Sequence, residues 1–363
     1  MIKELLMSNK IKTIGRTYLN NDMLYANFSG SGVWFKASGN KLKIDLLATK
    51  YDEENSRPYV SVLIDNARYD FPLDKELNTI ELPLEYGEHF IHILKRTETS
   101  VSHMAIKDIL VDNFIIFEDE PRLNIEYYGD SLTCGFGAMS TDPSEPFRTS
   151  TESFLDSYSY MVAKALNANY SAISISGFPV YKSRWNQSFP IDSVADMISI
   201  SSYKEDDTIE TVIPWDNTIY KPDLVIINLG TNDQSFLTEG QDWVDKLIEE
   251  TKSFEAAQTH PQYEEHLVNF RQRIVKFLED LFKTYGKDLK VLYLMGMIDV
   301  WPFVYDAIEG AIADFNNPNV YYHRLTGPTK DSIFGAVWHP SKVMHEKTAE
   351  EILEVIKQNN LGK

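Results

Sequence analysis

Cysteine, long apolar runs and an excess of basic charge are all missing from this chain. Cys134 is the only cysteine in 363 residues, which excludes an internal disulfide framework and a cysteine-based zinc cluster. No run approaches the ~18–20 apolar residues that a membrane span needs. Lys3, Lys10 and Lys12 interrupt the first sixteen residues, which contain no apolar core of signal-peptide length. We therefore expect a cytoplasmic protein.

The charge balance excludes further classes of partner. The chain carries 54 acidic and 35 basic residues, a formal net charge of −19. This balance repels phosphate backbones and anionic lipids, so neither nucleic acid nor a membrane is an expected partner. The sequence has no His-x-x-x-His pair and no phosphate-cradling Gly-x-x-x-x-Gly-Lys motif, so we expect no metal and no cofactor. Neutral substrates such as sugars are compatible with the charge.

The first third of the chain is predicted to be all β. Short runs rich in Val, Ile and aromatic residues alternate with Gly, Asn, Asp or Pro, which is typical of a β-sandwich or jelly roll. The predicted strands are Gly32–Ala37, Leu42–Ala48, Tyr59–Ile64, Arg68–Phe71, Thr79–Leu82, His89–Lys95, Ala105–Val111 and Asn113–Phe117. The charged stretch Glu118–Arg122 is the expected boundary, giving domains 1–118 and 119–363.

Beyond this boundary the pattern predicts an α/β/α domain with a five-stranded parallel sheet. Apolar runs alternate with helical periodicity, as in βαβ units. The predicted strands are Leu123–Tyr128, Tyr170–Ile175, Leu224–Leu229, Val291–Met295 and Val320–Tyr322. The predicted helices are Ser153–Leu166 with Ser153 as N-cap, Glu264–Tyr285, and a final helix from about Val343. Two polar stretches, 201–210 and 234–260, are expected to be acidic surface loops.

The sequence YYGDSLTCGFGA places a candidate nucleophile, Ser131, directly after the first predicted strand of this domain. In α/β sheets the carboxyl ends of strands carry the chemistry. A serine hydroxyl becomes an effective nucleophile only when a base removes its proton. Gly-Asp-Ser is also common in plain turns, so the tripeptide alone would be weak evidence. Its extension to GDSLTCGFG after a strand favours catalysis.

Two later segments offer donors for an oxyanion, together with the backbone N–H of Ser131 itself. Gly177 follows the second predicted strand, where it could present its N–H to a ligand. Asn232, in NLGTND, follows the third strand and could contribute its side-chain amide. In isolation, Gly177 is typical of a turn and Asn232 of a turn or helix cap, with Asp233 as the better cap.

His339 is the candidate base, because imidazole exchanges protons near neutral pH. It is the histidine in Trp-His-Pro-Ser, just before the predicted last helix. An acid normally accepts from the other ring nitrogen, but Ala336 and Val337 stand where we would expect one. Asp331 could reach only through an unusual loop. We therefore predict a Ser–His dyad, with a backbone carbonyl such as that of Val337 as acceptor.

These blocks resemble the SGNH (GDSL-type) hydrolase superfamily, in which Ser131, Gly177, Asn232 and His339 match the four defining residues. With the β-rich first domain, the resemblance points to carbohydrate esterase family 2 acetyl (xylan) esterases, which join a jelly roll to an SGNH domain. HFIHILKRTE at 89–98, Gly-Arg at 15–16 and VLID at 62–65 also fit that family.

The resemblance implies a serine esterase that removes acetyl groups from sugar hydroxyls, in a family that works with a dyad when the acid is missing. Trp338 matches an aromatic position of the family's acyl and sugar site, although it could equally be a core residue. Trp185 and Tyr181 are weaker candidates for a sugar platform. The expected substrates are acetylated xylo-, manno- or gluco-oligosaccharides taken up by the cell. The sequence does not specify which sugar or hydroxyl is deacetylated, or the oligomeric state.

Two other functions stay open. A carbohydrate-binding protein with little turnover would fit a β-sandwich beside a cleft that lacks a triad acid. An SGNH esterase or thioesterase acting on another acyl ester would need a larger apolar acyl pocket.

Overall fold

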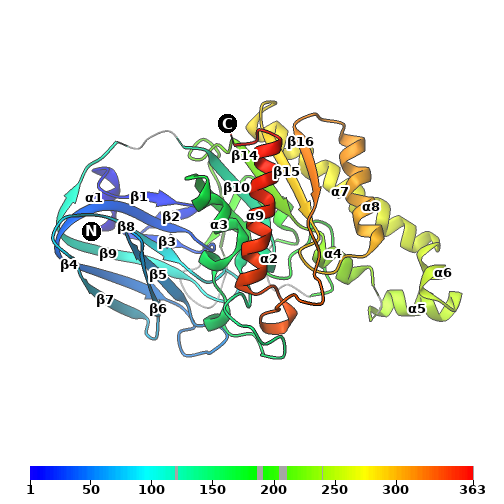
Figure 1. Ribbon diagram of the computed structural model, residues 1–363, viewed down its shortest axis with the longest axis horizontal. Coiled ribbons are helices and arrows are strands. Elements are labelled where there is room, and N and C mark those ends of the chain that lie inside the picture. The colour runs from blue at the N-terminus through cyan, green and yellow to red at the C-terminus, as the bar shows by residue number, and fades with distance from the viewer. Residues whose placement is uncertain (119–121, 186–190, 204–210, 239, 363) are drawn as a thin grey trace.

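The computed structural model describes residues 1–363 except 119–121, 186–190, 204–210, 239 and 363. An antiparallel β domain is followed by an α/β domain with a five-stranded parallel sheet, as the sequence predicted (Figure 1). The predicted domain boundary, between residues 118 and 119, borders residues 119–121, which lie outside the described part of the chain. In the described part of the chain, no helix combines the length and the apolar character needed to cross a membrane.

The β domain is built around one long strand, β4 (Gly32–Ala48), which joins two predicted strands. β4 bends where its pairing with β9 (Met104–Ile115) shifts register between Ser38 and Leu42. Its first half pairs with β8 (Glu88–Lys95), and its second half pairs with β7 (Leu77–Pro83). Alternate side chains of these strands fill a core that includes Phe35, Ile44 and Ile93.

The chain before β4 is more ordered than predicted. A short helix and three short strands precede β4, each too brief to show a hydrophobic period. They are α1 (Ile2–Met7), β1 (Lys12–Ile14), β2 (Thr17–Asn20) and β3 (Met23–Ala26). The remaining strands of this domain are β5 (Tyr59–Ile64) and β6 (Ala67–Pro72). β1 pairs with β4, while β3 pairs with β9.

The parallel sheet has strand order β11-β10-β14-β15-β16. Its strands are β10 (Asn124–Gly129), β11 (Asn169–Ser174), β14 (Leu224–Asn228), β15 (Lys290–Met295) and β16 (Val320–Arg324). Two of its inner strands, β14 and β15, are apolar apart from one terminal residue each, as expected for a sheet covered on both faces. The order places β10 between β11 and β14, so residues that follow these three strands gather at one edge.

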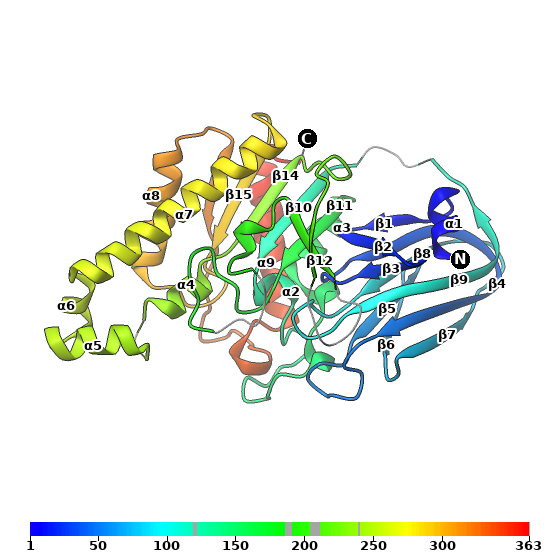
Figure 2. The ribbon, with the colours of Figure 1, turned by 180° about the vertical axis from the view of Figure 1, so that it is seen from behind.

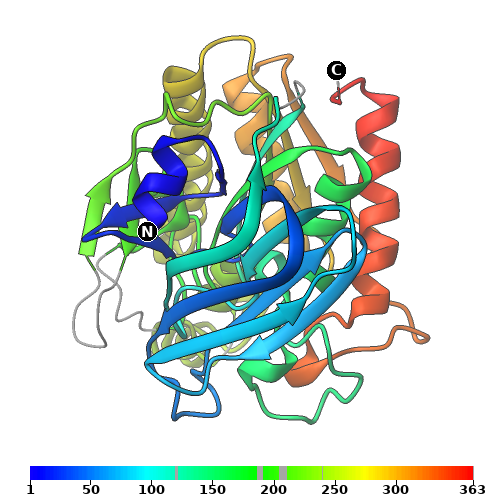
Figure 3. The same cartoon turned by 90° about the vertical axis from the view of Figure 1, so that its left-hand side faces the viewer.

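Helices cover both faces of this sheet, which gives the predicted three layers. One face carries α7 (Pro261–Tyr285) and α8 (Pro302–Phe315), which cross it side by side in Figure 2. The other carries α3 (Tyr158–Ala165) and α9 (Lys342–Gln358), and Figure 3 shows α9 running along the sheet beside the β domain. β1 also contacts the edge strand β11, so the β domain packs at this edge of the sheet.

Four local predictions are wrong. α3 begins at Tyr158 with Ser157 as its N-cap, because a 3-10 turn, Phe154–Asp156, comes first. Ser153 instead donates to Asp156. Residues 234–260 are not an acidic loop, since they contain α5 (Asp242–Thr251) and α6 (Phe254–Gln258).

The helices α5 and α6 extend from the far end of the α/β domain in Figure 1. Their apolar residues Val244, Leu247 and Phe254 nevertheless belong to the same core as α7. The prediction of a loop at 201–210 is wrong at residues 201–203, which lie in β12 (Ile200–Tyr203) and pair antiparallel with β13 (Thr211–Pro214). The rest of that stretch, 204–210, lies outside the described residues.

Candidate active site

The candidate nucleophile begins a short helix at the carboxyl end of β10. Asp130 caps this helix, α2 (Ser131–Cys134), by accepting from the backbone N–H of Leu132 at 3.0 Å. Ser131 is the first helical residue, so its own N–H has no acceptor within the helix. Gly135 ends the helix with φ 79°, and its N–H donates to the carbonyl of Ser131 at 3.1 Å. The backbone of Ser131 is therefore held between two caps.

His339 lies within hydrogen-bond distance of Ser131. Its Nε2 is 3.0 Å from Ser131 Oγ, and its Nδ1 is 3.1 Å from the carbonyl oxygen of Val337. A carbonyl can only accept, so Nδ1 carries the proton and Nε2 accepts from the serine hydroxyl. Burial lowers the pKa of His339 to about 4, which keeps the ring neutral and able to act as a base.

The turn that supplies this carbonyl is strained. Val337 has φ 54° and ψ 37°, and Trp338 has φ 59°, so two consecutive non-glycine residues are left-handed. The Val337 carbonyl is the acceptor that the sequence analysis proposed. Asp331 is exposed, and its backbone N–H donates to Thr329. The ring of Phe136 packs against the imidazole with 4.2 Å between ring centroids, which restricts the orientation of His339.

The segments carrying Ser131 and His339 are tied together through their backbones. The N–H of Ala336 donates to the carbonyl of Gly137 at 3.3 Å, and the N–H of Lys342 donates to the carbonyl of Ala138 at 2.8 Å. These bonds join the loop after α2 to the turn before α9. The serine and the histidine, 208 residues apart in sequence, therefore share one backbone framework.

Gly177 lies in a loop after β11 that is held by hydrogen bonds before and after this residue. The N–H of Ile175 donates to the carbonyl of Gly129 at 3.3 Å. Further on, the carboxylate of Asp233 accepts from the backbone N–H groups of residues 180, 181 and 182 at 2.7–3.1 Å. Gly177 itself has φ 81°. Asp233 is thus not the cap that the sequence analysis expected, because Gly230 is the N-cap of α4 (Thr231–Phe236).

Asn232 is buried beside Asp130, but its amide already has protein partners. Nδ2 donates to Asp130 Oδ2 at 3.0 Å and to the carbonyl of Phe178 at 3.1 Å. Both amide hydrogens are therefore engaged, so contact with an oxyanion would require one of them to be shared. Burial raises the pKa of Asp130 to about 7 and that of Asp233 to about 6. The role of Asn232 as an oxyanion donor stays a prediction.

The three aromatic candidates differ in accessibility. Trp338, next to His339, is 65% exposed, and Trp185 is 58% exposed. Tyr181 is half-buried, and its hydroxyl lies 3.0 Å from Nδ1 of His266. Its ring also packs against Phe236. Both tryptophans are therefore accessible, although the Arg184 guanidinium lies 5.6 Å from the Trp185 ring and Phe334 packs against Trp338 with 5.6 Å between ring centroids. Tyr181 instead holds the loop against neighbouring helices.

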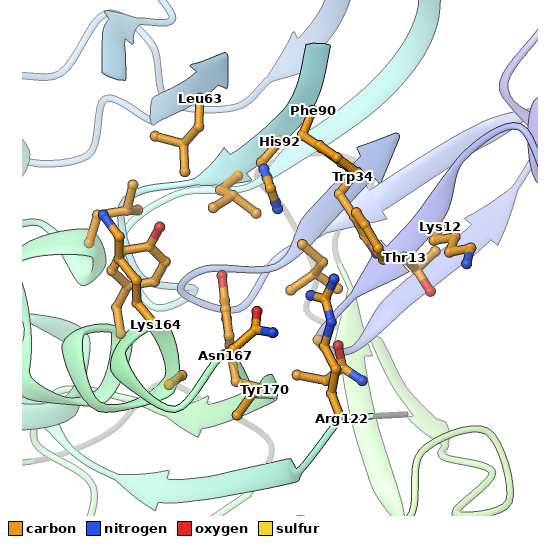
Figure 4. A pocket seen from close by; sticks show the side chains of 18 of the residues that line it. Lys12, Thr13, Trp34, Leu63, Phe90, His92, Arg122, Lys164, Asn167 and Tyr170 are labelled. Carbon is orange, nitrogen blue, oxygen red and sulfur yellow. The ribbon is translucent and has the colours of Figure 1, made fainter. Parts of the chain in front are cut away.

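A cavity of about 1060 Å³ lies between the two domains, and neither Ser131 nor His339 lines it. Figure 4 shows Trp34 and His92 of the β domain across the cavity from Asn167 and Tyr170 of the α/β domain. Two of its charged groups are engaged by neighbours: the Arg122 guanidinium lies 4.9 Å from the Trp34 ring, and Lys342 pairs with Asp156. The cavity is therefore separate from the candidate active site.

Several residues that shape the site were not predicted from the sequence. Asp130 and Asp233 were visible in the GDS and TND motifs, but their partners lie on other loops. Phe136 was visible only as part of GFG, with no pattern linking it to His339. Glu98, in the Lys-Arg-Thr-Glu sequence, reaches this region from the β domain. Each contact depends on tertiary structure, which local pattern does not encode.

Two protein-family descriptions match separate parts of this chain. Residues 13–116 match the carbohydrate esterase 2 N-terminal domain, and residues 125–352 match the GDSL-like lipase/acylhydrolase family. Among curated proteins, an acetylxylan esterase / glucomannan deacetylase of Cellvibrio japonicus is 28% identical over 232 residues. That match covers 62% of this chain and 62% of the relative.

A second relative is a cellulase/esterase, CelE, of Acetivibrio thermocellus, 23% identical over 92% of this chain but only 37% of its own length. This chain thus spans less than two thirds of either relative. Two solved structures have the same fold. A family two carbohydrate esterase from Clostridium thermocellum, in complex with cellohexaose, has a TM-score of 0.77 at 21% identity, covering 96% of this chain and 99% of that one. An acetyl xylan esterase from Butyrivibrio proteoclasticus has a TM-score of 0.80 at 20% identity, covering 97% and 96%.

Proposed function

This chain belongs to the GDSL-like lipase/acylhydrolase family, and on that basis we propose that it is a serine esterase that removes O-acetyl groups from carbohydrates. The observation that carries the proposal is the Ser131–His339 contact at 3.0 Å, with His339 Nδ1 bonded to the Val337 carbonyl. A nucleophile, a base and a group that orients the base are the minimum for acyl transfer through an enzyme-bound ester. Here a backbone carbonyl orients the base.

In the proposed reaction, Ser131 Oγ attacks the acetyl carbonyl carbon while its proton passes to His339 Nε2. The tetrahedral intermediate collapses, the bond to the sugar oxygen breaks, and Nε2 returns the proton to that oxygen. The serine then holds the acetyl group as an ester. Water attacks this ester with His339 again taking the proton, and collapse releases acetic acid and restores Ser131.

The oxyanion in both steps is proposed to lie between the N–H groups of Ser131 and Gly177. Within the described residues, neither N–H donates a hydrogen bond to the protein. A helix N-terminus at Ser131 also favours negative charge. Asn232 is retained as a third proposed donor, through a shared hydrogen of its amide.

A carbohydrate substrate is supported by three observations. The ring of Trp338 is exposed beside the base and offers an apolar face for a sugar. The net charge of −19 is compatible with a neutral ligand. Relatives are named for acetylxylan and glucomannan. Within this class we propose acetylated xylo-, manno- or gluco-oligosaccharides.

The decisive experiment is an acetate-release assay across acetylated xylo-, manno- and gluco-oligosaccharides. Ser131→Ala should lower kcat by at least about 10⁴-fold, since removing the nucleophile of a serine hydrolase abolishes its covalent route. Ser144→Ala, in an exposed loop, is the matched control and should retain full activity. Equal turnover by the parent and Ser131→Ala would refute the proposal.

Two further readouts separate the alternatives. A series of p-nitrophenyl esters from acetate to octanoate should show falling kcat/KM with chain length, whereas a rise would indicate an esterase for longer acyl groups. Glycan binding without Ser131-dependent acetate release would identify a carbohydrate-binding protein instead.

A further inference from the structure

The corner that follows β8 is a buried polar segment at the contact between the two domains. Lys95, Arg96, Thr97 and Glu98 are each no more than 2% exposed. The Lys95 ammonium donates to the carbonyls of Thr97 and Glu98, both at 2.6 Å, which fixes the turn from within. Arg96 donates to the carbonyls of Thr149 and Ser150 at 3.0 and 3.1 Å. The corner therefore presents Glu98 to the α/β domain in one orientation.

One oxygen of Glu98 contacts both sides of the candidate active site. Glu98 Oε2 accepts from the backbone N–H of Ser176 at 2.7 Å and lies 3.8 Å from Cys134 Sγ. Ser176 directly precedes Gly177. Cys134 lies on α2, one turn after Ser131. A carboxylate of the β domain thus touches the helix of the nucleophile and the loop of the proposed oxyanion donor.

Glu98, Cys134 and Glu152 have ligand-type atoms within 4.8 Å of one another, but their surroundings do not suit a cation. All three side chains are fully buried, and the Lys95 ammonium already supplies positive charge to Glu152. Burial and the neighbouring Glu98 charge raise the pKa of Glu152 well above its usual range, which favours its protonated form. The group is better explained as a hydrogen-bonded link between the domains.

We propose that Glu98 is a positioning residue for the oxyanion hole: its carboxylate holds the Ser176 N–H and thereby fixes the N–H of Gly177 relative to Ser131. This inference rests on the proposed esterase function. The β domain then takes part in catalysis without touching the substrate.

The hydrogen bonds around Gly177 support this role. Residues 175 and 178 are held by the carbonyl of Gly129 and by Asn232, respectively. Between them, the described residues offer Ser176 only one acceptor for its N–H, the Glu98 carboxylate. Gly177 has a left-handed φ. Because glycine has no side chain, the chain could adopt many other conformations here once that bond is lost.

The test compares Glu98→Ala and Glu98→Gln with the parent. Gln retains an oxygen that can accept from Ser176, whereas Ala removes the acceptor. Glu152→Gln is the matched control, because it changes a buried carboxyl of the same group that does not contact Ser176. Each variant is measured for thermal unfolding, for hydrogen exchange of the Ser176 amide by NMR, and for kcat and KM on an acetylated oligosaccharide.

We expect Glu98→Ala to accelerate exchange at Ser176 and to lower kcat by about 10- to 10²-fold with KM within about threefold, since a misplaced oxyanion donor acts on the transition state. Glu98→Gln should stay within about fivefold of the parent, and Glu152→Gln close to it. If Glu98→Ala fails to fold, the comparison of Glu98→Gln with Glu152→Gln decides. A neutral amide oxygen accepts more weakly than a carboxylate, so moderately faster Ser176 exchange is expected in Glu98→Gln and not in Glu152→Gln.

Unchanged exchange at Ser176 in a folded Glu98→Ala would overturn the proposal, and so would faster exchange with unchanged kcat. A parent protein without Ser131-dependent turnover would refute the esterase function, and with it the catalytic role of Glu98. That outcome is distinct, because the exchange measurement needs no turnover and still shows whether Glu98 holds the loop.

Discussion

The segments that carry Ser131 and His339 are built in opposite ways. The nucleophile segment uses regular structure: a strand, an aspartate cap, a helical turn and Gly135 at its left-handed end. The histidine segment places Val337 and Trp338 in the left-handed region, where side chains are strained. All four residues of α2 are buried, while Val337 and Trp338 are 45% and 65% exposed.

In the proposed dyad, a backbone carbonyl takes the position that an acid would occupy in a triad. The left-handed turn directs the carbonyl of Val337 back to the ring of His339, two residues later. A neutral carbonyl orients the imidazole but stabilises an imidazolium less than a carboxylate would. The strained turn therefore orients the imidazole of His339, but it stabilises a positive charge on that ring less than a carboxylate would. Three measurements test this contrast.

The largest effect is expected for Val337→Pro. Proline fixes φ near −65°, so it cannot adopt the φ of 54° seen at Val337, and the carbonyl would turn away from His339. We expect kcat to fall between about 10²- and 10⁴-fold, the upper value being the effect of a wrong histidine tautomer in a serine protease. Val337→Thr retains the backbone and should keep nearly full activity. Equal rates for the two variants would show that this carbonyl does not orient the base.

An intermediate effect is expected for the dependence of kcat/KM on acidic pH. The pKa of His339 is lowered to about 4, so its basic form persists as the pH falls below 6.5, the ordinary value. At pH 5 we expect at least about half of the plateau kcat/KM, whereas an ordinary histidine would leave about 3%. The same sign applies to folding: the unfolded chain binds the proton more readily, so stability declines from about pH 6.5 towards pH 4. Circular dichroism at each pH distinguishes the two losses, and an acid limb centred at 6.5 would contradict the burial of the ring.

The smallest effect is expected for Val337→Gly, which makes the histidine turn resemble the nucleophile turn. A β-branched residue in the left-handed region costs about 1–2 kcal/mol, and glycine removes that strain while adding freedom to the unfolded chain. We expect the free energy of unfolding to rise by about 0.5–1 kcal/mol, with activity within about threefold of the parent. Val212→Gly, in the ordinary strand β13, should instead destabilise the protein. A loss of stability in Val337→Gly would mean that its side chain contributes packing rather than strain.

Much of this architecture could be predicted from sequence because its signals are local. The five parallel strands are apolar runs, and Ser131 and His339 stand in recognisable motifs beside them. The Val337 carbonyl could be proposed because no acid was present nearby. Helices α5 and α6 were missed because their few apolar residues are diluted by charges, although Val244 and Leu247 recur at helical spacing.

The contacts between distant segments could not be predicted. Glu98 and Ser176 are 78 residues apart, and nothing in either motif indicates the other. Asp233 resembles a helix cap in sequence, yet it accepts from three N–H groups of another loop. Such pairings are determined by how the two domains and the loops pack. A single sequence records the residues but not their distances.

Arg16 shows what this packing means for biosynthesis. Its guanidinium, fully buried, donates to the carbonyls of Met197, Ile198 and Ile200, more than 180 residues later in the chain. On a ribosome adding about 5–20 residues per second, Arg16 emerges roughly 10–40 seconds before its acceptors. During that interval the guanidinium remains hydrated, and the first strands cannot pack in their final position. The N-terminal domain thus begins to fold first but is completed only when the chain is more than half synthesised.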